Sequence, residues 1–379
     1  MSNRTTSRSA ARIDGHRPRI MFAVTSDLSL RLLRDYPEYL CDIGWNVHVV
    51  CSPGPILKVR AQNSPVHFHA LKMRRNPAPL QDLRSLINWI RLCRRVQPDL
   101  LSVGTPKAGL LGGLAGVPRR VHLQRGLRME TSRALQRVVL GTAERIGAGV
   151  AHTVLAVSPS LKDVMVTLGL ARAEKIKVIG AGSSNGVDVR EFDSTQFSTE
   201  ELDELRTRFG IRRDVQTIGY VGRLTRDKGV DILERAVVQL RDWGTDFNLL
   251  IVGGVDDPTR SATLKRLLNS GFSVASTGAV DDPAIYFQLM DLLSLPTYRE
   301  GYPNVALEAS ASSKATVTTD ATGAVDSVLS GITGCIVPRG DSDALARELR
   351  KLLADPGQLD MMGVQARQNV TAHFDRPEF

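Results

Sequence analysis

The chain has 379 residues, 42% of them hydrophobic and 23% charged, a composition that excludes a disordered protein, and its length favours two domains. The net charge of +9 is uneven, because residues 1–195 hold 29 basic and 14 acidic side chains whereas the remainder holds 20 and 26. This asymmetry indicates that the first half meets something anionic. With no recognisable nucleic-acid module and only 5% aromatic residues, we exclude nucleic acid and favour an anionic membrane surface or a lipid diphosphate.

The first half of the chain alternates short apolar runs with amphipathic stretches. Residues 1–18 are polar and basic and precede no signal-peptide core, so we expect a mobile tail there. Apolar residues at helical spacing predict helices over 28–43 and 80–96. No run of about 18 apolar residues occurs, so no spanning helix is expected. The apolar runs between these stretches predict strands over 19–24, 46–51, 99–103, 119–123, 153–157 and 175–180.

The sequence GSSNGVDVREFDS, which begins at residue 182, is rich in Gly, Ser, Asn and Asp and indicates a linker. After a predicted helix near 200–209 the alternation restarts. We therefore expect a first Rossmann-like domain over 19–195 and a second over 196–379, each with a parallel sheet, and a ligand beyond the carboxyl ends of the strands. The strands predicted for the second domain cover 216–222, 247–254, 274–278, 292–296 and 315–319.

The four cysteines form no CxxC pair and have no zinc-ligand spacing. This usage indicates buried or inert thiols in a reducing, cytoplasmic compartment. They are Cys41, Cys51, Cys93 and Cys335.

A basic turn follows the first strand of the second half, in GYVGRLTRDKGVDIL. Arg223 and Lys228 lie between that strand and a helix expected to begin around Gly229. A guanidinium, an ammonium and a helix N-terminus together suit a diphosphate leaving group, on which negative charge grows as the bond to it breaks. A solvated basic turn is the alternative interpretation.

A second motif, TYREGYPNVALEASA, holds two carboxylates seven residues apart. Glu300 lies in a loop after a predicted strand, and Glu308 lies about one turn into a helix expected to begin near Asn304, after a favourable proline. The two side chains can reach one ligand from two sides. Alternatively, Glu308 complements the helix dipole and Glu300 is simply solvated.

The two motifs, G-R-L-x-x-x-K-G and E-G-x-P-x-x-x-x-E, are separated by an IVGG strand turn. Together they resemble the retaining glycosyltransferases of family 4. The stretches TSDLSLRLL, TPKAGLLG, QRGLRMET and SSNGVD resemble the bacterial branch that builds lipid-linked polysaccharides and glycans, so that the resemblance covers about residues 19–375. It implies an α/β fold of the GT-B type, with two Rossmann-like domains whose parallel sheets face each other across a cleft.

The resemblance implies a donor-binding role for seven residues. Arg223 and Lys228 would bind the donor diphosphate, Glu308 the ribose and Glu300 the transferred sugar, so that Arg223, Lys228 and Glu300 are the catalytic candidates. It also implies that no metal and no cofactor is needed, and Asp341 and Asp343 are better interpreted as helix-capping residues. Backbone amides near the donor would come from Gly301, Asn304 and Val305, at a helix start where N–H groups are free.

On the acceptor side, Lys107 and Arg125 follow strands of the first domain and are candidates to bind the acceptor, or surface bases. Relatives often carry a histidine where this chain has Gly104, so any role of that histidine is absent or reassigned. Relatives also commonly finish with a helix that returns to the first domain, and a sequence that stops at HFDRPEF predicts a short or missing crossover.

The helix over 80–96 combines an apolar stripe with four arginines. It is either a core-packing helix with a solvated basic face or a segment partly seated on an anionic membrane. His67 and His69 share one face of a strand and lack a third ligand, so we interpret them as structural.

We therefore expect a retaining, metal-independent glycosyltransferase that moves a hexose or N-acetylhexosamine from a nucleotide diphosphate-sugar, with UDP as the expected nucleotide, to a hydroxyl of a lipid-linked or other saccharide acceptor. We expect the enzyme in the cytoplasm, peripherally at the inner face of the membrane and attached through its basic N-terminal domain. Two alternatives stay open: a nucleotide-sugar 2-epimerase of the same architecture, and a donor-binding relative without activity.

Overall fold

The structure is a computed structural model, and the basic tail expected over 1–18 lies almost wholly outside the part of the chain that it describes. No helix in that part has the length and apolarity to cross a bilayer. The described residues are 17–62, 64–73, 79–255 and 258–376.

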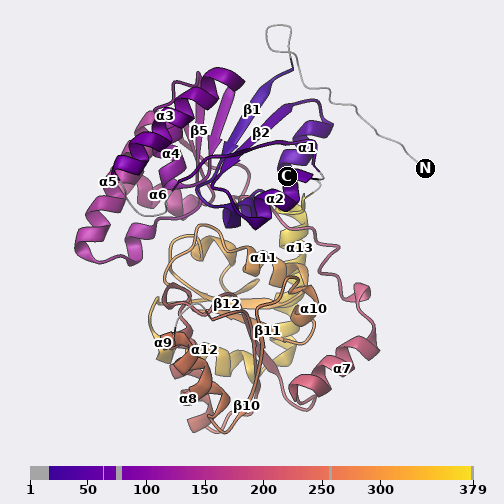
Figure 1. The fold of residues 1–379 in the computed structure, drawn as a ribbon. Coiled ribbons are helices and arrows are strands. Elements are labelled where there is room, and N and C mark those ends of the chain that lie inside the picture. The colour runs from indigo at the N-terminus through magenta and orange to yellow at the C-terminus, as the bar shows by residue number, and fades with distance from the viewer. Residues whose placement is uncertain (1–16, 63, 74–78, 256–257, 377–379) are drawn as a thin grey trace. The chain divides into compact units, whose positions relative to one another are not determined.

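The chain divides into two compact units (Figure 1). The first comprises Met1–Val157 and Lys162–Ile179, and the second comprises Ser158–Leu161 and Gly180–Phe379. The predicted domain limits differ from these units chiefly by the segment 180–195, which groups with the second unit. Each unit contains one parallel sheet covered by helices.

The first unit has a seven-stranded sheet in the order β3-β2-β1-β4-β5-β6-β7, with all neighbours parallel. Alternate side chains of a strand point to opposite faces, so Ile20 and Phe22 enter one core cluster and Met21 and Ala23 enter another. The strands are β1 (Arg19–Ala23), β2 (Asn46–Cys51), β3 (His67–Ala70), β4 (Leu100–Val103), β5 (Arg119–Gln124), β6 (Thr153–Ala156) and β7 (Ile176–Lys177).

Helices cover both faces of this sheet. In Figure 1, α3, α4 and α5 lie on one side of the strands and α1 and α2 on the other. α4 is the middle helix of its layer, because α3 and α5 both pack against it. The helices are η1 (Asp27–Leu32), α1 (Tyr36–Asp42), α2 (Pro55–Gln62), α3 (Pro79–Val96), α4 (Pro106–Gly113), η2 (Arg128–Thr131), α5 (Ala134–Val150), α6 (Pro159–Thr167) and η3 (Ala173–Lys175).

The single helix predicted over 28–43 is wrong, because a short 3-10 helix and α1 occupy this stretch. Arg34 between them adopts a left-handed φ of 42°, which ends helical geometry. Pro37 lies in the first turn of α1, where its missing N–H is tolerated. In the middle of one continuous helix over 28–43 the same proline would break or kink the helix. The strand predicted over 175–180 is likewise reduced to the two residues of β7.

The second unit has a six-stranded parallel sheet in the order β10-β9-β8-β11-β12-β13. Its central strand β8 is buried over its whole length, as expected for a parallel strand covered on both faces. The strands are β8 (Thr217–Val221), β9 (Asn248–Val252), β10 (Ser273–Gly278), β11 (Leu292–Leu295), β12 (Ala315–Thr319) and β13 (Gly334–Val337).

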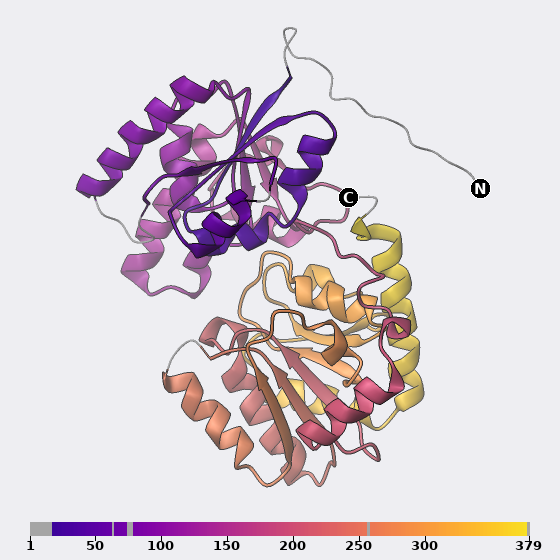
Figure 2. The ribbon, with the colours of Figure 1, turned by 45° about the vertical axis from the view of Figure 1, so that its right-hand side comes forward.

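Local capping sets several helix boundaries here. Ser198 and Glu201 form a reciprocal capping box at α7, and Asp341 caps α12 by accepting a hydrogen bond from the Ala344 amide at 2.8 Å. α13, yellow in Figure 2, runs beside the sheet. The helices are η4 (Ser194–Gln196), α7 (Thr199–Phe209), η5 (Arg226–Lys228), α8 (Val230–Asp242), α9 (Pro258–Leu268), α10 (Ala284–Phe287), α11 (Asn304–Ala311), η6 (Val325–Ser327), α12 (Ser342–Leu353) and α13 (Pro356–His373).

The sequence predicts a short or missing C-terminal crossover to the first domain. In the structure α13 has 18 residues, and the chain after it pairs with the linker. The Val187 amide donates to the Phe374 carbonyl at 2.9 Å, and the Arg376 amide donates to the Val187 carbonyl at 3.0 Å. These two bonds fix the end of α13 to the segment that enters the second unit.

Candidate active site

The loop after β8 places Arg223 at the carboxyl end of the second sheet. β8 ends at Val221, and Gly222 then adopts a φ of 146°. A Cβ added at Gly253, which follows β9, would lie 1.9 Å from the Gly222 carbonyl oxygen. Glycine therefore lets the ends of two neighbouring strands approach. Tyr220 donates its hydroxyl to the Arg223 carbonyl at 3.1 Å, which holds the Arg223 backbone while its side chain is exposed.

Lys228 is positioned by a glycine contact with the next strand of the sheet. Gly229 has a left-handed φ of 69° and is the N-cap of α8. A Cβ at Gly229 would lie 1.8 Å from the carbonyl oxygen of Pro296, just after β11. Only glycine satisfies both the backbone angle and this approach. The contact brings Lys228, the residue before it, to the loop that follows β11.

Asp227 joins the loop after β8 to the loop after β11. Its carbonyl accepts hydrogen bonds from the Tyr298 amide and the Thr297 hydroxyl, both at 2.9 Å. Its carboxylate lies 3.0 Å from Nη2 of Arg299 and accepts the Thr225 hydroxyl at 2.7 Å. Burial raises the pKa of Asp227, but the hydrogen bond from Thr225 and the charges of Arg299 and Lys228 outweigh it and hold that pKa below its usual value. The carboxylate is therefore a stable anchor.

The two sequence motifs meet in an ion pair between Lys228 and Glu300. The Lys228 ammonium donates to Oε1 of Glu300 at 2.6 Å, and the side chains are 24% and 10% exposed. The Glu300 amide donates to the Thr322 carbonyl at 2.8 Å, which fixes the loop that carries the carboxylate. A charged pair at this burial needs good hydrogen-bond geometry to offset its desolvation, and 2.6 Å meets that requirement.

The N-terminus of α11 follows the Glu300 loop directly. Pro303 is its N-cap, and Gly301 is packed so closely that a Cβ at Gly323 would lie 2.2 Å from the Gly301 carbonyl oxygen. Asn304 and Val305 are in the first turn of α11, where backbone amides lack intrahelical acceptors. The last donor-side candidate, Glu308, is partly exposed one turn further along.

The structure thus brings the seven candidates of the second unit to the carboxyl ends of β8 and β11 and to the start of α11. It pairs Lys228 directly with Glu300, a contact that the sequence does not predict. The sequence predicts a diphosphate as the partner of Lys228 and a sugar as the partner of Glu300. The short, buried contact means that each side chain also positions the other.

The first unit holds the two acceptor-side candidates at the carboxyl ends of adjacent strands. Lys107, in the first turn of α4 after β4, lies 2.8 Å from the Asp82 carboxylate of α3. Arg125 follows β5 and donates from Nη2 to the Leu32 carbonyl at 3.2 Å. Its Nε and Nη1 are buried without a hydrogen-bond partner among the described residues. Burial lowers the pKa of Arg125 to about 10, so the guanidinium stays charged at neutral pH.

Gly104 and Arg125 are in direct contact. A Cβ added at Gly104 would lie 2.6 Å from Nη1 of Arg125. The guanidinium therefore occupies the space that a side chain at position 104 would take. The glycine that stands where relatives often carry a histidine is therefore in contact with a buried arginine.

Comparison with known proteins identifies the family. Residues 31–182 match the glycosyl transferase 4-like domain, and residues 215–355 match glycosyl transferases group 1. The capsular polysaccharide biosynthesis glycosyltransferase CapM of Staphylococcus aureus is 35% identical over 361 residues, which are 94% of this chain and 93% of CapM. The chain belongs to glycosyltransferase family 4.

Further comparisons agree on the fold of this glycosyltransferase. N,N'-diacetylbacillosaminyl-diphospho-undecaprenol alpha-1,3-N-acetylgalactosaminyltransferase of Campylobacter jejuni is 27% identical over 73% of each chain. A glycosyltransferase of Rickettsia africae superposes with a TM-score of 0.79 at 19% identity, over 95% of both chains. Anabaena HepE, solved with UDP, superposes with a TM-score of 0.76 at 19% identity, over 95% of this chain and 96% of HepE. The predicted GT-B fold, with two parallel-sheet Rossmann-like domains, is confirmed.

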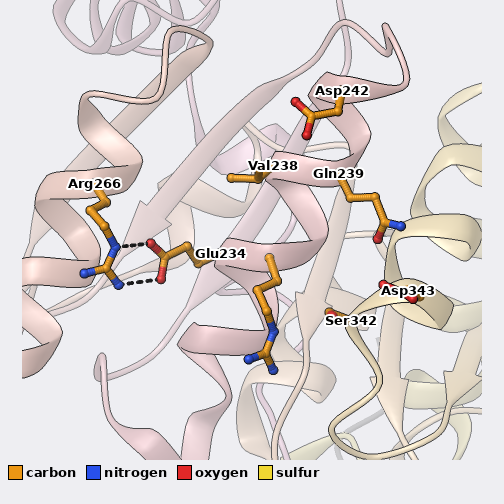
Figure 3. Close-up of a pocket in the computed structure, with 8 residues that line it drawn as sticks. Glu234, Val238, Gln239, Asp242, Arg266, Ser342 and Asp343 are labelled. Atoms are coloured by element: carbon orange, nitrogen blue, oxygen red, sulfur yellow. Dashed lines mark hydrogen bonds and ion pairs between the residues drawn. The ribbon is translucent and has the colours of Figure 1, made fainter.

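A separate open pocket of this glycosyltransferase contains none of the predicted site residues (Figure 3). Residues of α8 and α9 and the first turn of α12 form it. Arg266 of α9 donates from Nη2 to Oε2 of Glu234 at 2.7 Å on one side of it. Its lining is mixed in charge, with the guanidinium groups of Arg235 and Arg266 beside three carboxylates. The residues around it are Glu234, Arg235, Val238, Gln239, Asp242, Arg266, Ser342 and Asp343.

Asp341 is the N-cap of α12 as predicted, whereas Asp343 lies in the first turn of that helix. In the part of the glycosyltransferase that the structure describes, no three His, Cys, Asp or Glu side chains are grouped to hold a metal ion. Independence from metals and cofactors stays a prediction. His67 and His69 lie on β3, where Nε2 of His69 is 2.9 Å from Nδ1 of His48 and the rings of His48 and His67 stack, in line with a structural role.

Proposed function

We propose that this glycosyltransferase moves a hexose or N-acetylhexosamine from a UDP-sugar to a hydroxyl of a lipid-linked sugar, with retention of configuration, during synthesis of a cell-surface polysaccharide or glycan. The single observation that carries the donor half is the 2.6 Å pair between Lys228 and Glu300 at the carboxyl ends of β8 and β11. It sets a cation and a carboxylate side by side where α/β sheets bind their ligands.

The donor diphosphate would bind between Arg223, Lys228 and the amides at the start of α11. Arg223 is exposed on a backbone fixed by Tyr220, so its guanidinium can bind two phosphate oxygens. The amides of Gly301, Asn304 and Val305 add a helix N-terminus, which favours anions. Glu308 would accept hydrogen bonds from the ribose, and Glu300 would contact the transferred sugar.

In the proposed reaction the bond between the anomeric carbon and the diphosphate oxygen breaks while a bond to the acceptor hydroxyl oxygen forms on the same face. The acceptor proton passes to the leaving phosphate oxygen, so no separate general base is required. Arg223 and Lys228 stabilise the charge that grows on the diphosphate, which is electrostatic catalysis by preorganised groups. The protein needs neither a metal nor a cofactor in this scheme.

The acceptor half is supported by Arg125 and by the relatives. Nε and Nη1 of Arg125 are buried and unpartnered among the described residues, and such a cation is stabilised by an anion that enters beside it. The Campylobacter relative carries a diphospho-undecaprenol acceptor in its name, CapM is named for capsular polysaccharide, and HepE was solved with UDP. We assign the acceptor diphosphate to Arg125, with Lys107 as a second acceptor-side base.

A lipid-linked acceptor confines the reaction to a membrane surface. We place the enzyme in the cytoplasm, peripherally at the inner face of the cell membrane, and assign its attachment to the basic first unit. The excess of basic side chains in residues 1–195 supports this placement, because anionic lipids attract basic segments. Nucleic acid is not a partner in this scheme.

The decisive experiment is a diphosphate-release screen of several nucleotide-sugars with a lipid-linked acceptor, with product analysis for anomeric configuration. Arg223→Ala and Lys228→Ala should each lower turnover by about 10²-fold or more, and Glu308→Ala should weaken donor binding. Near-normal turnover in either of the first two variants would overturn the donor assignment.

The same screen separates the alternatives. Conversion of UDP-N-acetylglucosamine to its manno isomer without acceptor would identify an epimerase. Donor binding without diphosphate release for any acceptor would identify an inactive relative.

A further inference from the structure

The helix α3 presents two chemically different sides. Its buried side packs Trp89, Leu92 and Cys93 into the core of the first unit. On its other side Leu80 is 81% exposed and Leu83 is 56% exposed. Large apolar side chains at this exposure are ordinary when single, but a row of them indicates an interaction surface.

The exposed apolar residues of α3 form one row. Leu80, Leu83 and Ile87 are spaced by three and four residues, so at about 100° per residue they lie within a sector of about 60°. All three are exposed. We call them the α3 stripe.

The helix α5 repeats this arrangement. Leu135 is 80% exposed and Val138 is 66% exposed, and Val139 and Ile146 are also exposed. At helical spacing these four residues lie within a sector of about 100°. The buried side of the same helix holds Glu144, Gly147 and Ala148, so we call the four apolar residues the α5 stripe.

The two stripes belong to one layer. Both helices pack against α4, in the layer that covers one face of the seven-stranded sheet (Figure 1). Their exposed sides are therefore both directed away from that sheet. The two stripes therefore lie on the outer side of the same helix layer, with α4 between them.

The exposed charged side chains of the two helices are all arginines over their described length. Over the described length of the two helices no acidic side chain is exposed, because Asp82 is partly buried in its ion pair with Lys107 and Glu144 is buried. The exposed basic residues on these helices or directly before α5 are Arg84, Arg91, Arg94, Arg95, Arg133, Arg137 and Arg145.

We propose that the α3 stripe and the α5 stripe enter the headgroup and acyl boundary of an anionic lipid bilayer while exposed arginines of the same two helices bind lipid phosphates. A surface of leucine, isoleucine and valine on two helices whose exposed charged side chains are all arginines suits this partner. A symmetric pair of copies of this chain would place arginines against arginines, which favours the bilayer over a dimer. The proposal rests on the proposed function, since it names the surface by which the enzyme reaches a lipid-linked acceptor.

Vesicle co-sedimentation of the full chain tests the proposal. The protein should bind vesicles of equal parts phosphatidylglycerol and phosphatidylcholine and should bind pure phosphatidylcholine at least about tenfold more weakly, because the arginines act through lipid charge. Leu83→Glu/Ile87→Glu and Leu135→Glu/Val138→Glu should each lose at least about tenfold in partitioning to the anionic vesicles. Arg91→Ser/Arg94→Ser should bind the anionic vesicles more weakly than the unchanged protein at low salt, and this difference should shrink at high salt, where lipid charge is screened.

The matched control is Met361→Glu/Val364→Glu. These residues are also exposed and apolar and lie three apart on α13, at 66% and 51% exposure, yet they belong to the second unit. The control should bind vesicles like the unchanged protein. All variants change exposed positions, so their thermal unfolding should be unaltered.

Two outcomes would overturn the proposal: stripe variants that bind anionic vesicles as well as the unchanged protein, or sedimentation velocity that shows a dimer abolished by the same substitutions. Sugar transfer to a short-chain, water-soluble analogue of the acceptor tests the proposed function separately from the proposed membrane surface. If the unchanged protein and the stripe variants transfer sugar to it equally, the function holds whatever the vesicles show. If no transfer occurs but vesicle binding depends on the stripes, the function fails and the membrane surface stands.

Discussion

Lys228 and Glu300 are 72 residues apart in the sequence, in two different motifs, and their side chains meet at 2.6 Å. The two residues lie on neighbouring loops. These loops are held together by the close contact between Gly229 and Pro296 and by the hydrogen bonds of Asp227. In the free enzyme the ammonium is thus neutralised by a neighbouring carboxylate. A diphosphate that binds beside Lys228 must share its charge with Glu300, and this competition makes the pair experimentally separable.

Glu300→Gln should therefore bind UDP as tightly as the unchanged enzyme or several-fold more tightly, because a negative charge beside the diphosphate is removed. The same variant should lose about 10²-fold or more in turnover if Glu300 contacts the transferred sugar. Lys228→Met should weaken both UDP binding and turnover. Calorimetric titration with UDP and initial-rate measurements check the two effects.

If Glu300→Gln instead weakens UDP binding as much as Lys228→Met does, the carboxylate is needed only to hold Lys228 in place. The double variant decides this point, since coupled residues show interaction energies of about 0.5–3 kcal/mol in such cycles. A coupling near zero would contradict a functional pair.

Gly229→Ala should impair both stability and turnover. The new Cβ would lie 1.8 Å from the Pro296 carbonyl oxygen, at a φ of 69°, so the loop that carries Lys228 must move. We expect a loss of about 2–4 kcal/mol in the free energy of unfolding. The control Gly244→Ala has a similar φ of 72° but nothing within 4 Å, so it should cost only about 1 kcal/mol and leave turnover intact. Equal behaviour of the two variants in chemical denaturation would contradict the packing argument.

The alternation of apolar runs was sufficient to predict two parallel sheets, because buried parallel strands are continuous apolar segments. It did not predict β13, whose sequence GCIV lies in a Gly-rich stretch, nor the break at Arg34, since a single positive φ leaves no periodic signal. The residue types at Arg223 and Lys228 allowed a diphosphate site or a solvated basic turn, and the diphosphate site stays a prediction. The pairing of Lys228 with Glu300 and the contact of Gly104 with Arg125 could not be predicted, since both depend on tertiary distances between residues far apart in sequence.

Arg125→Met should raise the KM for the acceptor by about tenfold or more, because a charge-assisted contact to a diphosphate is lost, while the KM for the donor stays unchanged. Gly104→Ala should act in the same direction, since its Cβ would lie 2.6 Å from Nη1 of Arg125 and displace the guanidinium. Gly149→Ala is the control, because nothing lies within 4 Å of its added Cβ. Steady-state rates with the water-soluble acceptor analogue measure these values. A change in the donor KM alone would remove Arg125 from the acceptor side.

The buried carboxyl of Glu144 should make the stability of the protein depend on pH. Burial raises its pKa to about 7, against the hydrogen bond from Gln124 and the charge of Arg128. The folded state therefore binds more protons than the unfolded state between about pH 4.5 and 7, and stability falls as the pH rises through this window.

Two buried histidines have the opposite effect on stability. Burial lowers the pKa values of His48 and His122 to about 4. Stability therefore falls as the pH drops below about 6.5.

Glu144→Gln removes the contribution of Glu144 to this pH dependence and keeps the shape of the side chain. The stability of the variant should equal that of the unchanged protein near pH 4.5, exceed it increasingly up to about pH 7, and exceed it by at most roughly 3 kcal/mol above that pH. Glu174→Gln, at an exposed carboxylate of the same unit, should leave the profile unchanged. Thermal unfolding across this pH range measures the difference. Parallel curves for Glu144→Gln and the unchanged protein would show that Glu144 titrates alike in the folded and unfolded states.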